Sequence, residues 1–205
     1  MTLAIIIITS IVSIYAFNNG TWFRKLLLNP YQLVHRKEYW RIVTHGFIHA
    51  DWIHLLVNMF VLYSFGIFTE KAFAQLASYG YIRHPQLNYL VLYFGGILVS
   101  AIPSVIKHRD HPWYNSVGAS GAVSSVIFIT IFFQPKNLIF FYFIPVPAIL
   151  FGVLYLIYSQ YMSRKSEQHV NHDAHFYGAV FGFIYPLLIH PPLIQIFLSQ
   201  IGLGG

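Results

Sequence analysis

Charge and cysteine are the two things this sequence has least of. Only 9% of its 205 residues are charged, and it contains no cysteine, whereas about a quarter of the residues of a soluble domain carry charge. The absence of cysteine excludes disulfides, a thiol nucleophile and thiolate metal sites. Since 57% of the residues are hydrophobic, a soluble globule would lack the polar side chains needed to cover its surface. The composition therefore predicts a polytopic membrane protein, whose lipid-facing surface is apolar.

Six apolar stretches divide the chain. They cover residues 3–17, 52–69, 87–106, 117–133, 138–162 and 174–190. Because a helix needs about 20 residues to cross the hydrocarbon layer, we predict an all-α membrane protein built as a bundle of six transmembrane helices. The first, fourth and sixth stretches are short. The first could extend to Phe23, the sixth could extend toward Ile201, and the fourth could begin below the bilayer surface.

The segments between these stretches leave no room for a separate soluble domain. We predict one membrane domain over residues 1–205, with a large first loop at about 18–51, a core at about 40–190 and a polar, mobile loop at 163–173. The first stretch is apolar enough for a signal peptide. However, no Lys or Arg precedes it and no clear cleavage site follows, so a retained helix is the favoured interpretation.

The formal charge of +6 is scattered through the loops. Without a basic face, the sequence predicts no nucleic-acid partner, and attraction to anionic lipid headgroups is the simpler use of this charge. The loops after the first, third and fifth stretches carry nine of the twelve basic residues: Arg24, Lys25, Arg36, Lys37, Arg41, Lys107, Arg109, Arg164 and Lys165. Taken alone, this bias predicts that the termini lie outside the cytoplasm.

A candidate nucleophile opens the fourth stretch, in the sequence Gly118-Ala119-Ser120-Gly121. Small neighbours leave the Ser120 hydroxyl accessible, and the free N–H groups of a helix N-terminus favour the negative charge of an acyl-transfer oxyanion. The alternative is a small-residue surface for helix packing, which is common in membranes.

A candidate base stands in the sixth stretch. On a helix His175 shares a face with Gly178 and Gly182, and the two glycines form a G-x-x-x-G pattern that lets another helix pack closely. Packing against the small residues around Ser120 would bring the His175 imidazole to the serine hydroxyl, as nucleophile activation requires. The alternatives are a structural histidine near the interface, or a haem or metal ligand.

A third group of polar residues lies at the start of the second stretch. His54 and Asn58 are four residues apart and therefore share a helix face. As neutral donors they could hold an oxyanion, or they could simply form hydrogen bonds between helices. His45 and His49 precede this helix, where we expect its wet end.

No acidic residue lies within the six apolar stretches. The acids are Glu38, Asp51, Glu70, Asp110, Glu167 and Asp173. Asp173 would point to a different helix face from His175, so we predict a Ser–His dyad rather than a triad. A dyad buries fewer charges, which suits a site below the membrane surface.

These motifs, in this order, resemble the rhomboid intramembrane proteases from Trp40 to about Gly182. The matching residues are Trp40-Arg41, the group of His49, His54 and Asn58, Phe65-Gly66 with Glu70, Gly118-Ala119-Ser120-Gly121, and Ala174-His175 with Gly178 and Gly182. The resemblance implies a serine endopeptidase that cleaves membrane-protein substrates near the membrane surface. It implies no metal or other cofactor.

The resemblance also assigns parts to residues. It implies that Ser120 and His175 are catalytic and that His54, Asn58 and the Ser120 backbone N–H bind the oxyanion. Gly118, Ala119 and His49 complete the expected oxyanion and substrate-binding group. The fifth helix and the loop 163–173 would be similar to the family's substrate gate, loosened at its start by Pro145 and Pro147.

Two features depart from the family pattern. Ser124 stands where some relatives have a tyrosine that stacks on the catalytic histidine. Bacterial rhomboids of this type are expected to have cytoplasmic termini, in the cell (inner) membrane, with the site open outward. The charge bias points the other way, and we adopt the family orientation.

Two other functional classes compete with a protease: a membrane cytochrome ligated by His54 and His175, and an inactive rhomboid-like protein that binds membrane helices without cutting them.

Overall fold

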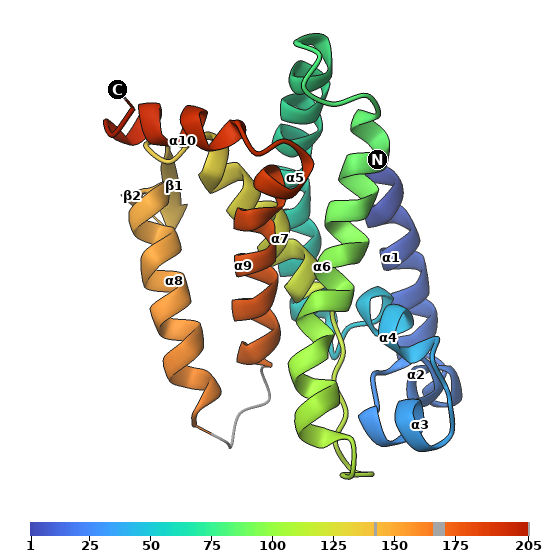
Figure 1. The fold of residues 1–205 in the computed structure, drawn as a ribbon. Coiled ribbons are helices and arrows are strands. Elements are labelled where there is room, and N and C mark those ends of the chain that lie inside the picture. The colour runs from blue at the N-terminus through green and yellow to red at the C-terminus, as the bar shows by residue number, and fades with distance from the viewer. Residues whose placement is uncertain (142, 166–170, 205) are drawn as a thin grey trace.

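A computed structural model describes residues 1–141, 143–165 and 171–204. The described chain is mainly helical, with most of the long helices running side by side (Figure 1). Each of the first four apolar stretches forms one helix, with bounds within three residues of the prediction except that the second helix continues nine residues beyond Thr69 to Ser78. The four helices are α1 (Thr2–Phe17), α5 (Trp52–Ser78), α6 (Pro85–His108) and α7 (Ser120–Phe133).

The first loop folds into short helices of its own. These are α2 (Gly20–Leu26), α3 (Pro30–His35), α4 (Arg41–Thr44) and the 3₁₀ turn η1 (His45–Phe47). The Arg41 guanidinium is buried, donates to the backbone carbonyls of Arg24 and Leu27 at 2.8 Å, and pairs with Glu38 at 2.6 Å. One side chain thus holds three separate parts of the loop together, and the loop is compact.

Among the described residues, two helices are long and apolar enough to cross a membrane: α5, of 27 residues, and α6, of 24. The helices α1, α7 and the later α8 are apolar but shorter, with 16, 14 and 16 residues. At 1.5 Å per residue, α7 extends about 21 Å, less than the roughly 30 Å of a hydrocarbon core. The described chain is mainly helical, as predicted. The number of six membrane spans remains a prediction, because only two of the described helices have the length and hydropathy of a span.

The fifth stretch does not form one helix over 138–162. It begins as an antiparallel hairpin of β1 (Leu138–Phe141) and β2 (Ile144–Pro147), and α8 runs only over Ala148–Ser163. Pro145 and Pro147 explain the difference, because proline lacks the N–H that a helix interior needs. The hairpin precedes α8, which lies at the edge of the bundle in Figure 1.

The sixth stretch ends earlier than its possible extension to Ile201. Helix α9 spans His172–Ile189, and after Pro191 and Pro192 the chain turns into α10 (Leu193–Ile201). Figure 1 shows α10 lying across the end of the bundle rather than continuing α9. The adjacent prolines cannot continue the helix, and they redirect the tail over the core.

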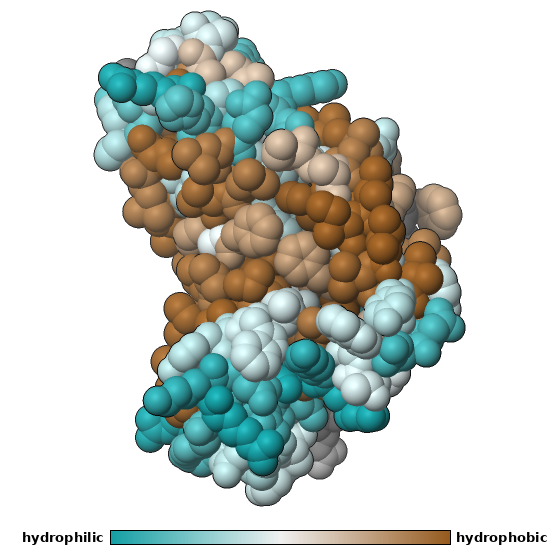
Figure 2. Space-filling model, turned by 90° about the vertical axis from the view of Figure 1, so that its right-hand side faces the viewer, coloured by the Kyte–Doolittle hydropathy of each residue, from teal (hydrophilic) through white to brown (hydrophobic). Residues whose placement is uncertain are grey.

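The centre of the molecule is α7, which packs against α5, α6, α8 and α9 and buries eleven of its fourteen residues. On the face that Figure 2 shows, a belt of hydrophobic side chains lies between two hydrophilic ends. This banding is what a protein seated in a bilayer requires, with apolar surface toward lipid and polar surface toward water.

Candidate active site

The helices α7 and α9 approach each other backbone to backbone. A Cβ added at Gly178 would overlap the carbonyl oxygen of Gly121, and one at Gly182 would overlap the backbone of Ser125. The Ser125 hydroxyl donates to the carbonyl of Gly178 at 2.8 Å, which joins the two helices directly. The G-x-x-x-G pattern of α9 and the small residues of α7 therefore do meet, and we call this contact the α7–α9 seam.

Ser120 is the first residue of α7 and is partly exposed. The turn before it is fixed at Gly118, whose φ of +114° is a conformation that L side chains rarely adopt. A Cβ at Gly118 would also lie 2.7 Å from Cε1 of His54. As the first residue of the helix, Ser120 has an N–H without an intrahelical acceptor, so the N–H is available to a bound group.

His175 lies in the first turn of α9, one residue beyond Ala174, whose carbonyl is 3.4 Å from the Cβ position of Gly121. The Asn171 side chain caps this helix at the Ala174 N–H, and its amide donates to Ser104 at 2.8 Å and to Ser116 at 3.2 Å. Asn171 therefore ties the start of α9 to the loop that leads into the nucleophile. Sequence reasoning missed this residue, because it lies in the loop predicted to be mobile; residues 166–170 of that loop are outside the described part.

The seam brings the first turns of α7 and α9 together, one turn carrying Ser120 and the other His175. Within the described residues no direct hydrogen bond joins the Ser120 hydroxyl to the His175 ring. Catalytic hydrogen bonds are often longer in a free enzyme than in its complex.

His54 faces the turn before Ser120. The Ala50 N–H donates to Nδ1 of His54 at 3.4 Å, so the neutral ring carries its proton on Nε2. Nε2 is 2.9 Å from the Cβ position of Gly118, which puts a donor beside the nucleophile segment. Asn58 is buried and donates to the His54 carbonyl at 2.9 Å, which leaves its amide a second N–H.

His49 is fully buried and uses both ring nitrogens. Its Nδ1 lies 3.0 Å from the Ser13 hydroxyl, which itself donates to the Phe47 carbonyl, and its Nε2 accepts from the Ala119 N–H at 3.5 Å. The proton is therefore on Nδ1. Burial, and secondarily the nearby His54, lowers the pKa of His49 to about 3. His49 is thus a neutral link between α1 and the turn that holds Ser120.

The family model described as "Rhomboid domain" matches residues 36–192, which is most of the chain. This chain belongs to the rhomboid family. "RHOMBOID-like protein 12, mitochondrial" of Arabidopsis thaliana is 29% identical over 154 residues, covering 67% of this chain and 43% of that protein.

A second Arabidopsis thaliana relative, "RHOMBOID-like protein 6, mitochondrial", is 39% identical over 92 residues, which cover 45% of this rhomboid and 25% of that protein. This rhomboid thus spans less than half the length of the curated relatives it matches. Membership of the family makes the chain a membrane protein, in agreement with its hydrophobic belt.

The departure at Ser124 has a counterpart elsewhere in this rhomboid. The ring of Tyr155, on α8, is stacked on His175 with centroids 6.3 Å apart and planes inclined by 25°. The Tyr155 hydroxyl lies 2.6 Å from that of Ser124. Sequence reasoning missed Tyr155, because no local pattern shows which residue of α8 faces α9.

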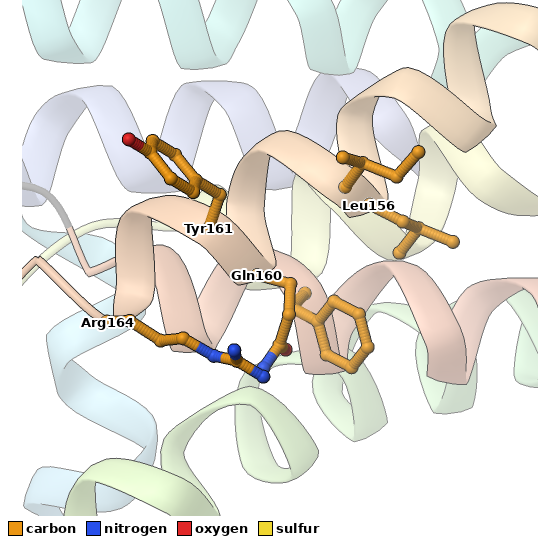
Figure 3. A pocket seen from close by; sticks show the side chains of 6 residues that line it. Leu156, Gln160, Tyr161 and Arg164 are labelled. Carbon is orange, nitrogen blue, oxygen red and sulfur yellow. The ribbon is translucent and has the colours of Figure 1, made fainter.

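A groove of about 400 Å³ lies along α8, and α9 contributes one residue to its lining. Its lining residues are Leu156, Ile157, Gln160, Tyr161, Arg164 and Phe176. Figure 3 shows Arg164 and Gln160 directed toward each other at one end of it. Elsewhere in the described residues, no three His, Asp or Glu side chains are grouped as a metal site would need.

Proposed function

We propose that this rhomboid is an intramembrane serine endopeptidase in which Ser120 is the nucleophile and His175 the general base. The observation that carries the proposal is the α7–α9 seam. Its glycines bring the first turn of α9 against the first turn of α7, and each turn carries one member of the pair. The substrates are membrane proteins cut near the membrane surface.

The reaction follows from the groups around the pair. His175 takes the proton of the Ser120 hydroxyl as its oxygen attacks the scissile carbonyl, and later gives that proton to the leaving amine. The Ser120 N–H, Nε2–H of His54 and the second amide N–H of Asn58 bind the oxyanion. Water then hydrolyses the acyl-enzyme. Gly118 and Ala119 shape the turn, and His49 holds it.

A dyad suffices in this mechanism. Asp173 is adjacent to the base in sequence but pairs with Lys107 at 3.9 Å, so its carboxylate is directed to the α6 end. The imidazole is instead flanked by the Tyr155 and His172 rings. An inactive, helix-binding rhomboid-like protein is the competing function, and the presence of both Ser120 and His175 favours the enzyme.

Labelling by a fluorophosphonate tests the proposal. Purified protein should be labelled, and both labelling and cleavage of a model transmembrane substrate should vanish in Ser120→Ala and in His175→Ala. Ser64→Ala is the matched control, because this exposed α5 serine bonds only the preceding helical turn. Asn58→Ala should lose about 100-fold, the effect of removing one oxyanion donor. Labelling that persists in Ser120→Ala would reject the enzyme and leave the binding protein.

We further propose that residues 1–205 form one membrane unit in the cell (inner) membrane, with cytoplasmic termini and an active site open outward. The word "mitochondrial" in the names of two relatives describes those proteins. The absence of native cysteine makes the orientation testable with single cysteines at Arg24 and Arg83. Labelling of the Arg24 position from the cytoplasmic side would overturn this orientation.

A further inference from the structure

Tyr155, on a third helix, contacts His175 directly and is linked to Ser120 through the Ser124 hydroxyl. Its ring is stacked on His175, and its hydroxyl meets Ser124, one turn after Ser120. The Ser124 hydroxyl in turn lies 2.8 Å from the Ser120 carbonyl. The Tyr155 side chain therefore contacts His175 through its ring. Its hydroxyl is linked to the Ser120 carbonyl through the Ser124 hydroxyl.

Counting protons fixes the direction of these hydrogen bonds. Ser124 has one hydroxyl proton, and it donates that proton to the Ser120 carbonyl. The Ser124 oxygen must then accept from the Tyr155 hydroxyl, which has one proton to give. The tyrosine is thereby fixed in rotation as well as in position, and its ring plane stays nearly parallel to the imidazole.

We propose that Tyr155 is the positioning residue of the catalytic base, so that the orientation of His175 depends on where α8 lies. This inference rests on the proposed function. Helix α8 buries only Ala148, Gly152 and Ser159 among its sixteen residues, so its backbone is weakly held. A tyrosine on α7 would fix the histidine from a rigid helix, whereas Tyr155 couples the base to a peripheral one.

Two substitutions of Tyr155 distinguish the effect of its ring from the effect of its hydroxyl. In Tyr155→Phe the ring remains and the hydrogen bond is lost, so kcat should fall about threefold to tenfold. In Tyr155→Leu the stacking is lost as well, and kcat should fall roughly 10- to 100-fold at unchanged KM, because a displaced base reacts slowly. The pH–rate profile of Tyr155→Leu should shift, since the environment of the imidazole changes.

Tyr158→Leu is the matched control. Tyr158 lies three residues further along α8 and meets His172 rather than His175, so this variant should keep the wild-type kcat and pH profile. The double variant Tyr155→Leu with Ser124→Tyr, which moves the ring to α7, should recover part of the lost kcat. Equal kcat and pH profiles in the two leucine variants would overturn this inference alone. Activity in Ser120→Ala would instead overturn the proposed function.

A second inference concerns the groove along α8. A further cavity, between α7, α8 and α9, adjoins the groove at Leu156 and is lined by apolar residues only. We call the two adjoining cavities together the channel, with Gln160 and Arg164 at one end. Arg164 is exposed, and its guanidinium has no ion-pair or hydrogen-bond partner among the described residues. It ends α8, as the residue after Ser163.

We infer that this channel binds one anionic phospholipid, with an acyl chain along α8 and its phosphate on Arg164. Helix α8 is about 24 Å long, which exceeds the roughly 15 Å depth of one leaflet. An unpaired guanidinium at the edge of an apolar channel offers a phosphate two parallel hydrogen bonds. A neutral helix or peptide would leave that guanidinium without a partner.

Native mass spectrometry of detergent-purified protein tests this site. After incubation with phosphatidylglycerol or with phosphatidylcholine, the wild type should retain one phosphatidylglycerol and about tenfold less phosphatidylcholine. Arg164→Gln should lose this preference. Lys165→Gln should keep it, because the Lys165 ammonium lies over the Tyr161 ring at 4.6 Å and not in the groove. Equal retention in the two variants, or no preference in the wild type, would overturn the inference.

Discussion

The α7–α9 seam and helix α8 are held in the bundle by opposite means. In the seam, glycines and serines let two backbones touch, and α7 buries eleven of its fourteen residues. Helix α8 buries three of sixteen, and what it gives the site is one side chain, Tyr155. The seam sets where Ser120 and His175 lie, whereas α8 contacts His175 through one side chain, which we have proposed to orient it.

The two regions should therefore differ in how strongly substitutions affect the proposed activity. A contact between backbones cannot yield to an added atom, because no side chain is present to change its rotamer. A contact through flexible side chains can yield by small rotations. Changes in the seam should therefore abolish the proposed activity, and equal changes in α8 should moderate it.

The largest expected effect comes from one added methyl group in the seam. Gly178→Ala places its Cβ against the Gly121 carbonyl, so the helices must separate. We expect a loss of at least about 100-fold in fluorophosphonate labelling rate and about 1–3 kcal/mol in unfolding free energy.

Gly152→Ala adds the same methyl group to α8 as a control. Its Cβ would lie 3.2 Å from Cδ1 of Ile131 and 3.5 Å from Cε1 of Phe128, which are ends of side chains that can move. Labelling should fall by less than about threefold. If the two alanine variants lose equal activity, the contrast between the seam and α8 does not hold.

Lowering the pH should decrease the stability of the fold through His49, which links α1 to the turn before Ser120. His49 has a pKa of about 3 when folded and about 6.5 when unfolded. Between these values the unfolded chain binds the additional proton, so stability is full above about pH 6.5 and decreases as the pH falls. The slope for one histidine is at most about 1.4 kcal/mol per pH unit.

Thermal unfolding in detergent between pH 7.5 and 5 measures this slope. His49→Gln should be less stable than the wild type at pH 7.5 but should lose less stability on acidification. His84→Gln, which changes an exposed histidine, is the control and should follow the wild type. Parallel curves for His49→Gln and the wild type would contradict the assignment of this proton to His49.

The smallest effects should come from two buried serines. Ser125→Ala removes the hydrogen bond to the Gly178 carbonyl and should cost about 1 kcal/mol, as interhelical hydrogen bonds in membranes do. Ser159, on α8, is buried, and its hydroxyl has no partner among the described residues. Ser159→Ala should therefore be neutral or slightly stabilising. Chemical denaturation measures the unfolding free energy of both variants. A larger loss of stability in Ser159→Ala than in Ser125→Ala would contradict this prediction.

The sequence predicted those structural features that depend on residues close together in the chain. The apolar stretches predicted three helices closely and the start of a fourth, α5, which continues beyond its predicted end. The glycine spacing on α9 predicted the seam, because a G-x-x-x-G face lets another helix pack closely. The fifth stretch was misassigned at its start, since its apolar residues suit a strand as well as a helix and Pro145 and Pro147 favour the strand. The extension to Ile201 was wrong because Pro191 and Pro192 turn the chain.

Contacts between distant elements could not be predicted in this way. Nothing near Tyr155 in the sequence indicates that its ring meets His175, since that depends on how α8 rotates against α7. Asn171 was similarly hidden, because its partners Ser104 and Ser116 come from another helix and loop. Both assignments required the packed structure, whereas Ser120 and His175 were predicted from their neighbours.

Two ion pairs of the first loop differ in their exposure to water. The Arg41–Glu38 pair is shielded, with side chains 8% and 22% exposed, whereas the His35–Asp110 pair is open to water at 43% and 66%. Dissolved ions screen exposed charges far more than enclosed ones. Added salt therefore weakens the His35–Asp110 pair, when His35 is protonated, more than the Arg41–Glu38 pair, while the Leu28–Ser116 backbone bridge and the hydrogen bonds of the Asn29 amide still attach this loop to the α6–α7 connection.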